Sequence, residues 1–472
     1  MDKFVKRMIP SVALKTGGSM TVTSGGMVNR TKLSSDAWLT ISSGGSGRNI
    51  ANVNRFDSRI FISSGGTLVN TSGFDLHRPA VLGGNLTISS GATVSSAFVD
   101  EGYLSISAGG YSFHVNASGS VVGNNTARGH VVIRGSADEV SIFPERDFFI
   151  LDGGYGSGIY LYGGSGIVSS GCSADNIQVI SSGYARIYGT LNGGSATGAG
   201  HLFIDGTGNN LSAIESGDIY IGSGASAFGI YLSSGRMSVN GNASNVVCEL
   251  SSDYVSVGSG GILTGGNIKG LLVASNGGII QNTTVGGGAH IRNTGSAVSI
   301  TVSSGGSLNV SSGGTARIVT VSSGGLVLTS DGAETRSCVI ADDGSYLQVK
   351  SGGKSWNDTA THGPGRIHAS SGASVFNPLA ESGGYLRGEG NFYNGTVKNG
   401  GVLWAWPGGY VQGFHVSSGG TMVISGSASA NTVYLSSGGT LTVMSGGTAY
   451  NVHSSAGAVV NSSAGAVITY VS

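Results

Sequence analysis

The densest group of charged side chains lies between residues 131 and 165, and four of its carboxylates are candidates for chemistry. These carboxylates are Asp138, Glu139, Glu145 and Asp147, with Arg134 and Arg146 close to them in the sequence. Two carboxyl groups on either side of a glycosidic bond act as acid and nucleophile in glycoside hydrolysis. Charges of both signs intermingled in one stretch are more typical of a solvated loop. We therefore predict a loop here and no catalytic residues, and the four carboxylates are the candidates for an enzymatic alternative.

Seven aromatic residues form a second group within 55 residues of each other. They are Trp356, Tyr385, Phe392, Tyr393, Trp404, Trp406 and Tyr410. Trp404 and Trp406 alternate, so on a strand their side chains share one face. Planar side chains on a rigid face can stack on sugar rings through apolar contact that needs no charge. Trp356, Trp404, Trp406 and Tyr410 are therefore candidate ligand-binding residues, and the alternative is stacking inside the fold.

Patterns for metal, phosphate and cofactor chemistry each lack an essential residue. Calcium-binding solenoids need Gly-Gly-x-Gly-x-Asp, and the glycine clusters at 44–49 and 153–158 have no Asp at that position. Neither cluster is followed by the Lys-Ser/Thr of a phosphate-binding loop. Cys172, Cys248 and Cys338 lie 76 and 90 residues apart, which fits neither a metal knuckle nor a disulfide framework. We therefore expect no metal site and no cofactor.

A fixed internal repeat must position these groups. The tetrapeptide Ser-Ser-Gly-Gly begins at Ser303, Ser311 and Ser322, at intervals of 8 and 11 residues. Ser417 and Ser436, which begin two further copies, are 19 residues apart. The repeating unit is therefore about 19 residues long and is divided into two halves.

The residues after each Gly-Gly pair alternate with the period of a β-strand. The aligned segments are Leu86-Thr-Ile88, Leu104-Ser-Ile106, Leu308-Asn-Val310, Leu347-Gln-Val349, Met422-Val-Ile424 and Leu441-Thr-Val443. The first and third side chains share a face that can be buried, and glycine permits the positive φ of a corner. Strands this short are stable only when they stack on similar neighbours. The pattern predicts an all-β protein, a parallel β-solenoid of about 20 to 25 coils with one coil per repeat.

The repeat is regular over residues 1–130, 301–350 and 416–472, and the sequence departs from it over 131–165 and 351–415. No Pro-rich or charged linker divides the chain. We therefore predict a single elongated solenoid domain over residues 1–472.

Charge and hydropathy exclude several classes of partner. Lys and Arg number 24, Asp and Glu also number 24, and charged residues are only 10% of the chain. Without a net positive charge, binding to nucleic acid is not expected.

No signal peptide is recognisable at the start of the chain, and no window has the ~20 apolar residues of a membrane helix. The chain ends in repeat sequence without the strands of a membrane barrel. Direct membrane insertion of this chain is therefore not expected. The sequence is compatible with a fragment, with a separately anchored surface protein and with a phage tail component.

The half-repeats SSGGTLTV at 436–443 and MSGGTAYNV at 444–452, and SSGGSLNVSSGGTARIVTV at 303–321, carry a resemblance to a known family. They resemble the 19-residue repeats in passenger domains of the diffuse-adherence family of self-associating autotransporter adhesins. The resemblance implies a single-stranded right-handed parallel β-helix on a bacterial surface, with cell–cell aggregation, biofilm formation and adhesion to host cells. It also implies O-linked sugars on repeat serines. The matching serines are Ser42, Ser43, Ser303, Ser304, Ser311, Ser312, Ser436 and Ser437.

Together these features predict a non-enzymatic cell-surface adhesin that acts through many weak contacts. The predicted partner is a second copy on a neighbouring cell, and host-cell or matrix glycans are further candidates. Ladders of Ser, Thr and Asn would each contribute hydrogen bonds of ~1 kcal/mol or less, so strength comes from number. Two alternatives stay open: a polysaccharide-binding or polysaccharide-degrading β-helix such as a phage tailspike, and a structural filament or sheath subunit.

Overall fold

The structure is a computed structural model that describes residues 3–52, 59–63, 66–70, 76–77, 79–82, 85–90, 92–95, 97–100, 103–117, 130–144 and 146–471. Over these residues the chain is a parallel β-solenoid of about 22 turns and contains no helix. The all-β solenoid predicted from the repeat is therefore confirmed.

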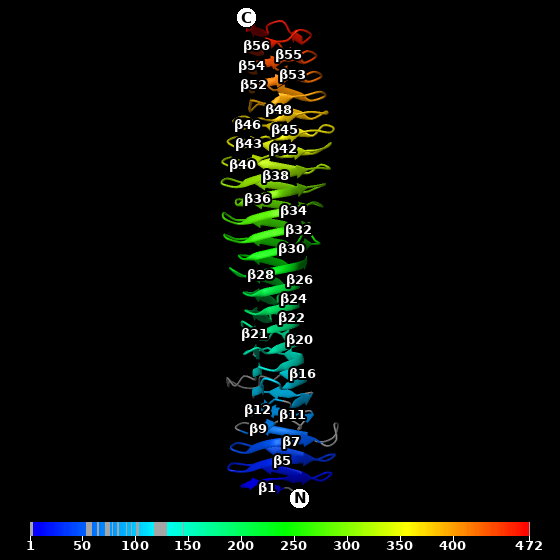
Figure 1. The fold of residues 1–472 in the computed structure, drawn as a ribbon, viewed down its shortest axis with the longest axis vertical. Helices are drawn as coiled ribbons and strands as arrows, with labels where there is room; N and C mark the ends of the chain where they lie inside the picture. The colour runs from blue at the N-terminus through cyan, green and yellow to red at the C-terminus, as the bar shows by residue number, and fades with distance from the viewer. Residues whose placement is uncertain are drawn as a thin grey trace. The chain divides into compact units, whose positions relative to one another are not determined.

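The chain divides into two compact units, Met1–Met237 and Ser238–Ser472. Unit 1 is coloured from blue to green in Figure 1, and unit 2 from green to red. From β15 (Tyr103–Ile106) onward, each coil has a strand of four residues in one sheet and a longer segment in a second sheet. In the first coils the long strands β5 (Met27–Leu33) and β7 (Ser46–Asn52) belong instead to the sheet that later holds the short strands. The single domain expected from the sequence stays a prediction.

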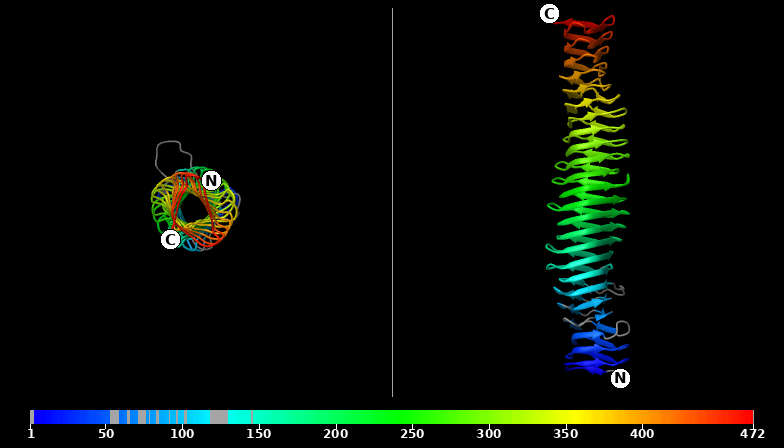
Figure 2. Two further views of the ribbon diagram at one scale, coloured as in Figure 1. Left: turned by 90° about the horizontal axis from the view of Figure 1, so that it is seen from above. Right: turned by 45° about the vertical axis from the view of Figure 1, so that its right-hand side comes forward.

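Unit 1 illustrates how the coils stack. Strands β21 (Ser165–Val168), β23 (Tyr184–Ile187) and β25 (His201–Ile204) follow one another in the sheet of short strands. The second sheet holds β20 (Tyr155–Tyr162), β22 (Ser173–Ile180), β24 (Thr190–Thr197) and β26 (Thr207–Ile214). All neighbours pair in parallel, and Ile177, Gly194 and Leu211 lie opposite one another in successive coils. Figure 2 shows this succession of parallel arrows from a second side.

The interior of each unit is built from the alternating apolar residues identified in the sequence. In β37 (Ser307–Val310), Leu308 and Val310 are completely buried, and Ser307 and Asn309 are partly exposed on the opposite face. The apolar pairs at 86/88, 104/106, 347/349, 422/424 and 441/443 are equally buried. The predicted period-two burial is therefore confirmed for all six segments.

The two glycines of the repeat have different tasks. At the turn before β37, Gly305 adopts a φ of 70°, a left-handed conformation that glycine reaches without steric cost. Gly306 has an ordinary φ, but a Cβ there would lie 2.5 Å from the carbonyl oxygen of Val285 in the preceding coil. The first glycine therefore permits the turn, and the second permits close contact between coils.

The long strands contain a bend that the sequence analysis did not predict. In β22 the bend is at Asn176, with a φ of 54°, and in β26 it is at Asn210, with a φ of 53°. Asn is several-fold enriched among non-glycine residues with positive φ. In β24 the same place is taken by Gly193, with a φ of 73°. In the sequence, an Asn or Gly that recurs near the middle of long segments could have predicted this bend.

The stretches that depart from the repeat nevertheless keep the register. Residues 131–165 include β18 (Ser136–Ile142) and β19 (Asp147–Ile150), and Val140 lies opposite Ile159 of β20. The loop predicted for this charged stretch is therefore wrong, because its alternating apolar residues fill the interior as elsewhere. Residues 351–415 behave similarly: Val375 of β46 (Ser374–Phe376) lies opposite Phe392 of β49 (Asn391–Tyr393).

Candidate functional site

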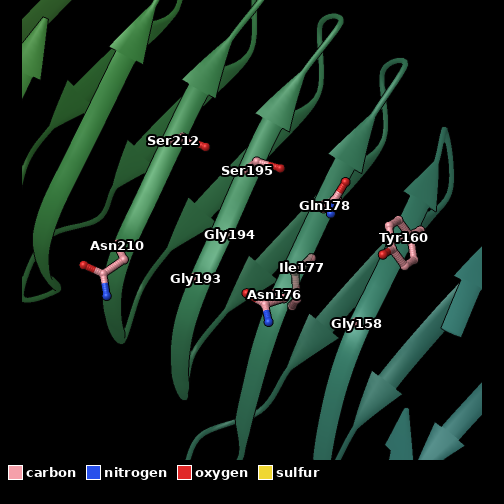
Figure 3. Close-up of a pocket in the computed structure, with 10 residues that line it drawn as sticks. All are labelled: Gly158, Tyr160, Asn176, Ile177, Gln178, Gly193, Gly194, Ser195, Asn210 and Ser212. Carbon is pink, nitrogen blue, oxygen red and sulfur yellow. The ribbon is translucent and has the colours of Figure 1, made fainter. Parts of the chain in front are cut away.

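A hollow of about 380 Å³ lies on the outer side of the long strands of unit 1. It spans β20, β22, β24 and β26, at the place where these strands bend. Figure 3 shows Asn176 and Asn210 on either side of a bare stretch of backbone at Gly193 and Gly194. The ten lining residues are Gly158, Tyr160, Asn176, Ile177, Gln178, Gly193, Gly194, Ser195, Asn210 and Ser212.

The hollow exists because the bend of β24 carries no side chain at Gly193. At the bend, Gly193 lies between Asn176 and Asn210 of the neighbouring coils. The next residue, Gly194, is partly exposed, whereas Ile177 and Leu211 in the same register are buried. A side chain at Gly193 would occupy the space, since its Cβ would lie 2.6 Å from Oδ1 of Asn176, whereas a Cβ on Gly194 would point inward and lie 2.8 Å from Leu191.

The wall of the hollow is a row of polar side chains on successive coils. Tyr160, Gln178, Ser195 and Ser212 lie opposite one another in register and face outward. Within the part of the chain that the structure describes, no hydrogen bond joins the side chains of Gln178, Ser195 or Ser212 to another group. The same holds for the carboxamides of Asn176 and Asn210. None of the ten lining residues carries a charge.

A paired polar ladder runs directly beside this unpaired row. The carboxamide Nδ2 of Asn192 donates to Oδ1 of Asp175 at 3.1 Å, and Nδ2 of Asn209 donates to Oδ1 of Asn192 at 2.9 Å. The hydroxyl of Tyr155 donates to Asp175 at 2.6 Å, and this hydrogen bond raises the pKa of Tyr155. The ladder therefore ties four consecutive coils together through side chains alone.

The predicted aromatic site divides between the two sheets of unit 2. Trp356 of β43 (Lys354–Trp356) and Tyr410 of β52 (Tyr410–Val416) belong to the sheet of long segments. Trp404 of β51 (Val402–Ala405) belongs to the sheet of short strands. Phe392, also counted with this group, is completely buried in the interior. The four candidate binding residues therefore do not form one site.

Trp356 begins a continuous stack of rings along the outside of its sheet. Its ring centroid lies 5.3 Å from that of Phe376, which lies 5.0 Å from that of Tyr393. The planes of these pairs differ by only 16° and 14°, and the guanidinium of Arg336 lies 4.7 Å from the Trp356 ring. These neighbours cover the ring faces, so the faces are not open to a sugar.

Trp404 is arranged differently. Its side chain faces outward and is 41% exposed, and its indole N–H donates to the hydroxyl of Ser425 at 2.8 Å. The Trp406 ring meets it edge to face at 6.5 Å. Trp406 also contacts the guanidinium of Arg387 at 5.3 Å and the ring of His368 at 5.2 Å. Burial lowers the pKa of His368.

The candidate carboxylates do not converge. Asp138 and Glu139 lie at the bend of β18 in the sheet of long segments, where Glu139 contacts Nδ1 of His114 at 3.2 Å. Asp147 lies on β19 in the other sheet, where it accepts a hydrogen bond from Ser165 and contacts Nδ1 of His130 at 3.3 Å. Glu145 lies outside the described residues. The described carboxylates therefore do not form the facing pair that glycoside hydrolysis requires.

The repeat serines lie at the turns between strands. The second serine of each pair, at positions 43, 304, 312 and 437, is exposed. The first serine is partly buried at positions 42, 303 and 311 and exposed at position 436. The hydroxyl of Ser303 donates to the carbonyl of Val285 in the preceding coil at 3.2 Å. In three of the four pairs the second serine is thus the more exposed residue, and in the fourth pair both serines are exposed.

The three cysteines are free and buried. Burial is the main cause that raises the pKa of the Cys248 and Cys338 thiols. Over the described residues, no three His, Cys, Asp or Glu side chains are grouped closely enough to hold a metal ion.

No protein-family model matches the chain, and no curated protein matches it. One solved structure similar to the chain is that of a TibC-catalysed, hyper-glycosylated fragment of TibA, with 25% sequence identity and a TM-score of 0.46. The alignment covers 63% of this chain and 100% of that fragment. In the described parts of this chain, no helix has the length and apolar character needed to span a membrane.

Proposed function

We propose that this chain is a non-enzymatic adhesion module of a bacterial cell surface, which associates with further copies of itself through ladders of polar side chains. The observation that carries the proposal is the hydrogen-bonded ladder of Asp175, Asn192 and Asn209 on consecutive coils. The arrangement recurs along the chain in the pairs Asn29–Asn49, Asn357–Asn377 and Asn431–Asn451, at 3.3, 3.0 and 2.8 Å.

A ladder of this kind can bind a second ladder. Each carboxamide has two N–H donors and an oxygen with two lone pairs, and the contact within the ladder uses only part of this capacity. The remaining groups face solvent at regular intervals set by the coil. Each hydrogen bond to a partner contributes ~1 kcal/mol or less, so stable association requires many of them in register.

The positions of the carboxylates support the non-enzymatic part of the proposal. Asp138 and Asp147 belong to different sheets; Asp138 accepts a hydrogen bond from the backbone N–H of the adjacent Glu139, and Asp147 contacts His130 of a neighbouring strand. Their arrangement is that of outward-facing side chains on a repetitive surface. The surface location and the O-linked sugars are proposed from the resemblance of the repeats, and the exposed second serines are the proposed acceptors.

The test compares the full chain with a ladder variant that carries Asn192→Ala, Asn209→Ala, Asn377→Ala and Asn451→Ala. Beads coated with each protein are mixed, and clumping is followed by light scattering. We expect beads coated with the ladder variant to need about tenfold more protein on their surface for equal clumping. Many weak contacts act together, so a small loss of affinity at each contact causes a large loss of overall binding. The control carries Ser170→Ala, Ser223→Ala, Ser371→Ala and Ser455→Ala, which change exposed turn residues off the ladders.

Two results would contradict the proposal. Equal clumping by the ladder variant, with an unchanged β circular dichroism spectrum, would exclude the ladders as the contact surface. Formation of new chain ends in a polysaccharide incubated with the protein would make the chain an enzyme.

A second candidate function, glycan binding at Trp404, is favoured by the exposure and fixed orientation of that indole. Its only ring contact within the described residues is the edge-to-face one with Trp406, whereas a ring and a guanidinium stack on Trp356. Retention of Trp404→Ala on columns of surface polysaccharides should fall, whereas Trp356→Ala should be retained like the wild type. Equal retention of all three proteins would exclude Trp404 as a binding residue.

A further inference from the structure

We propose that the hollow over β20, β22, β24 and β26 is a binding site for one sugar unit of a neutral glycan. This inference goes beyond self-association and does not depend on it, since the hollow lies beside the paired ladder and uses different side chains.

The distance between the side chains of Asn176 and Asn210 suits a single sugar ring. Asn176 and Asn210 lie two coils apart, and adjacent parallel strands are about 4.8 Å apart, so the gap between the two carboxamides is about 10 Å. Gly193 leaves this gap open, and the backbone of Gly193 and Gly194 lines it. Figure 3 shows the two Asn side chains flanking the recess, with Ser195 beside it and Tyr160 at one end.

The lining groups match the hydroxyls of a sugar. Three carboxamides and two serine hydroxyls offer donors and acceptors close together, and each sugar hydroxyl can also donate and accept. The described side chains around them satisfy none of these groups, so a ligand replaces only water. The ring of Tyr160 adds an apolar surface against which a pyranose can pack.

The same features exclude other ligand classes. No lining residue is positively charged, so a phosphate or carboxylate would find no counter-charge. The strands of the hollow are hydrogen-bonded to neighbours on both sides, so no free sheet edge is available to add a peptide strand. Recognition must therefore come from side-chain amides and hydroxyls.

One substitution closes the hollow with little disturbance of the fold. Gly193→Asn places an Asn at a φ of 73°, close to the values that Asn176 and Asn210 adopt. The nearest atom to its Cβ is the flexible end of Asn176, at 2.6 Å. Elsewhere, Asn377 donates to Asn357 on the preceding coil at 3.0 Å, so consecutive Asn residues at the bend already occur in this chain.

The matched control is Gly413→Asn in unit 2. Gly413 has a φ of 68°, and its Cβ would lie 2.4 Å from Oδ1 of Asn394. The chemical change and the local environment are thus the same as at Gly193, but the residue is remote in sequence from the hollow.

The experiment measures binding of cellotetraose, maltotetraose and mannotetraose to the full chain by isothermal titration calorimetry and saturation-transfer NMR. We expect at least one to bind with a dissociation constant of about 1 mM or lower, and Gly193→Asn to weaken it at least about tenfold. Gly413→Asn should bind like the wild type. The proposal is overturned if none of the three sugars binds the wild type, if Gly193→Asn binds equally well, or if both variants lose binding equally. Because the readout is binding in solution, its failure is independent of the bead-clumping test.

Discussion

At the scale of the residue, the most unusual group is a carboxyl in the interior of unit 2. Asp358 is completely buried, and its Oδ1 accepts a hydrogen bond from the backbone N–H of Cys338 at 2.8 Å. Burial penalises the charged form and raises the pKa of Asp358 from 3.8 to about 7. The folded chain therefore binds a proton at this residue more tightly than the unfolded chain does.

This difference predicts a stability that falls as the pH rises. Below pH 3.8 the carboxyl is neutral in both states, and its contribution is complete. Between pH 3.8 and about 7 the unfolded chain releases the proton and the folded chain keeps it, so stability declines by up to about 1.4 kcal/mol per pH unit. We expect the thermal unfolding midpoint, followed by circular dichroism, to be higher at pH 5 than at pH 7.5.

Asp358→Asn should remove most of this slope, because the amide keeps the acceptor for Cys338 and does not titrate. Asp343→Asn, at an exposed turn, is the control and should keep the wild-type slope. Identical slopes for Asp358→Asn and the wild type would show that Asp358 is not the titrating group.

At the scale of the element, strands of successive coils compensate for each other in size. Phe148 of β19 lies opposite Gly166 of β21, and both face the interior. A Cβ on Gly166 would lie 1.7 Å from a ring carbon of Phe148. The large residue of one coil therefore occupies the space that the next coil leaves free.

Gly166→Ala should destabilise the chain by about 1 to 3 kcal/mol, because it overpacks a dense interior. The substitution would otherwise be favourable, since alanine loses less conformational entropy than glycine. Adding Phe148→Leu should restore much of the loss, giving a coupling that urea unfolding of the two single variants and the double variant can measure. Strictly additive effects would mean that the two positions do not compensate.

These elements also show where sequence reasoning succeeds and where it stops. The burial of Leu308 and Val310 follows from a pattern that three neighbouring residues display. The Phe148–Gly166 pair and the hollow at Gly193 depend on residues one coil away, which are 17 or 18 positions distant in the sequence. Because the coil length varies, these partners cannot be aligned until the register is known.

The arrangement of the aromatic residues also could not be predicted from the sequence. Trp356 and Trp404 belong to the same group of aromatic residues in the sequence, 48 positions apart, yet they lie on different sheets of the solenoid. Their ring faces also differ, and only the contacts of neighbouring coils decide which face is covered.

At the scale of the whole molecule, the balance of charge determines how two copies can approach. The chain has 24 positive and 24 negative residues and a charged fraction of only 10%. Two copies therefore have little net repulsion or attraction at long range. The ladders consist of uncharged carboxamides except for the carboxylate of Asp175, so contacts between them depend little on the ionic atmosphere.

Self-association should for this reason be nearly independent of salt. Raising the ionic strength from about 0.01 M to 1 M shortens the screening length from about 30 Å to about 3 Å, which weakens ion pairs on the surface. We expect bead clumping, or the weight-average mass in sedimentation velocity, to change less than about twofold over this range, because the proposed contacts, apart from those of Asp175, are hydrogen bonds between neutral groups. A protein whose copies bind through the Lys398–Glu381 type of exposed ion pair would instead dissociate as salt is added. A steep loss of clumping with salt would thus reassign the contact surface from the Asn ladders to the charged turns, and the ladder variant would then clump like the wild type.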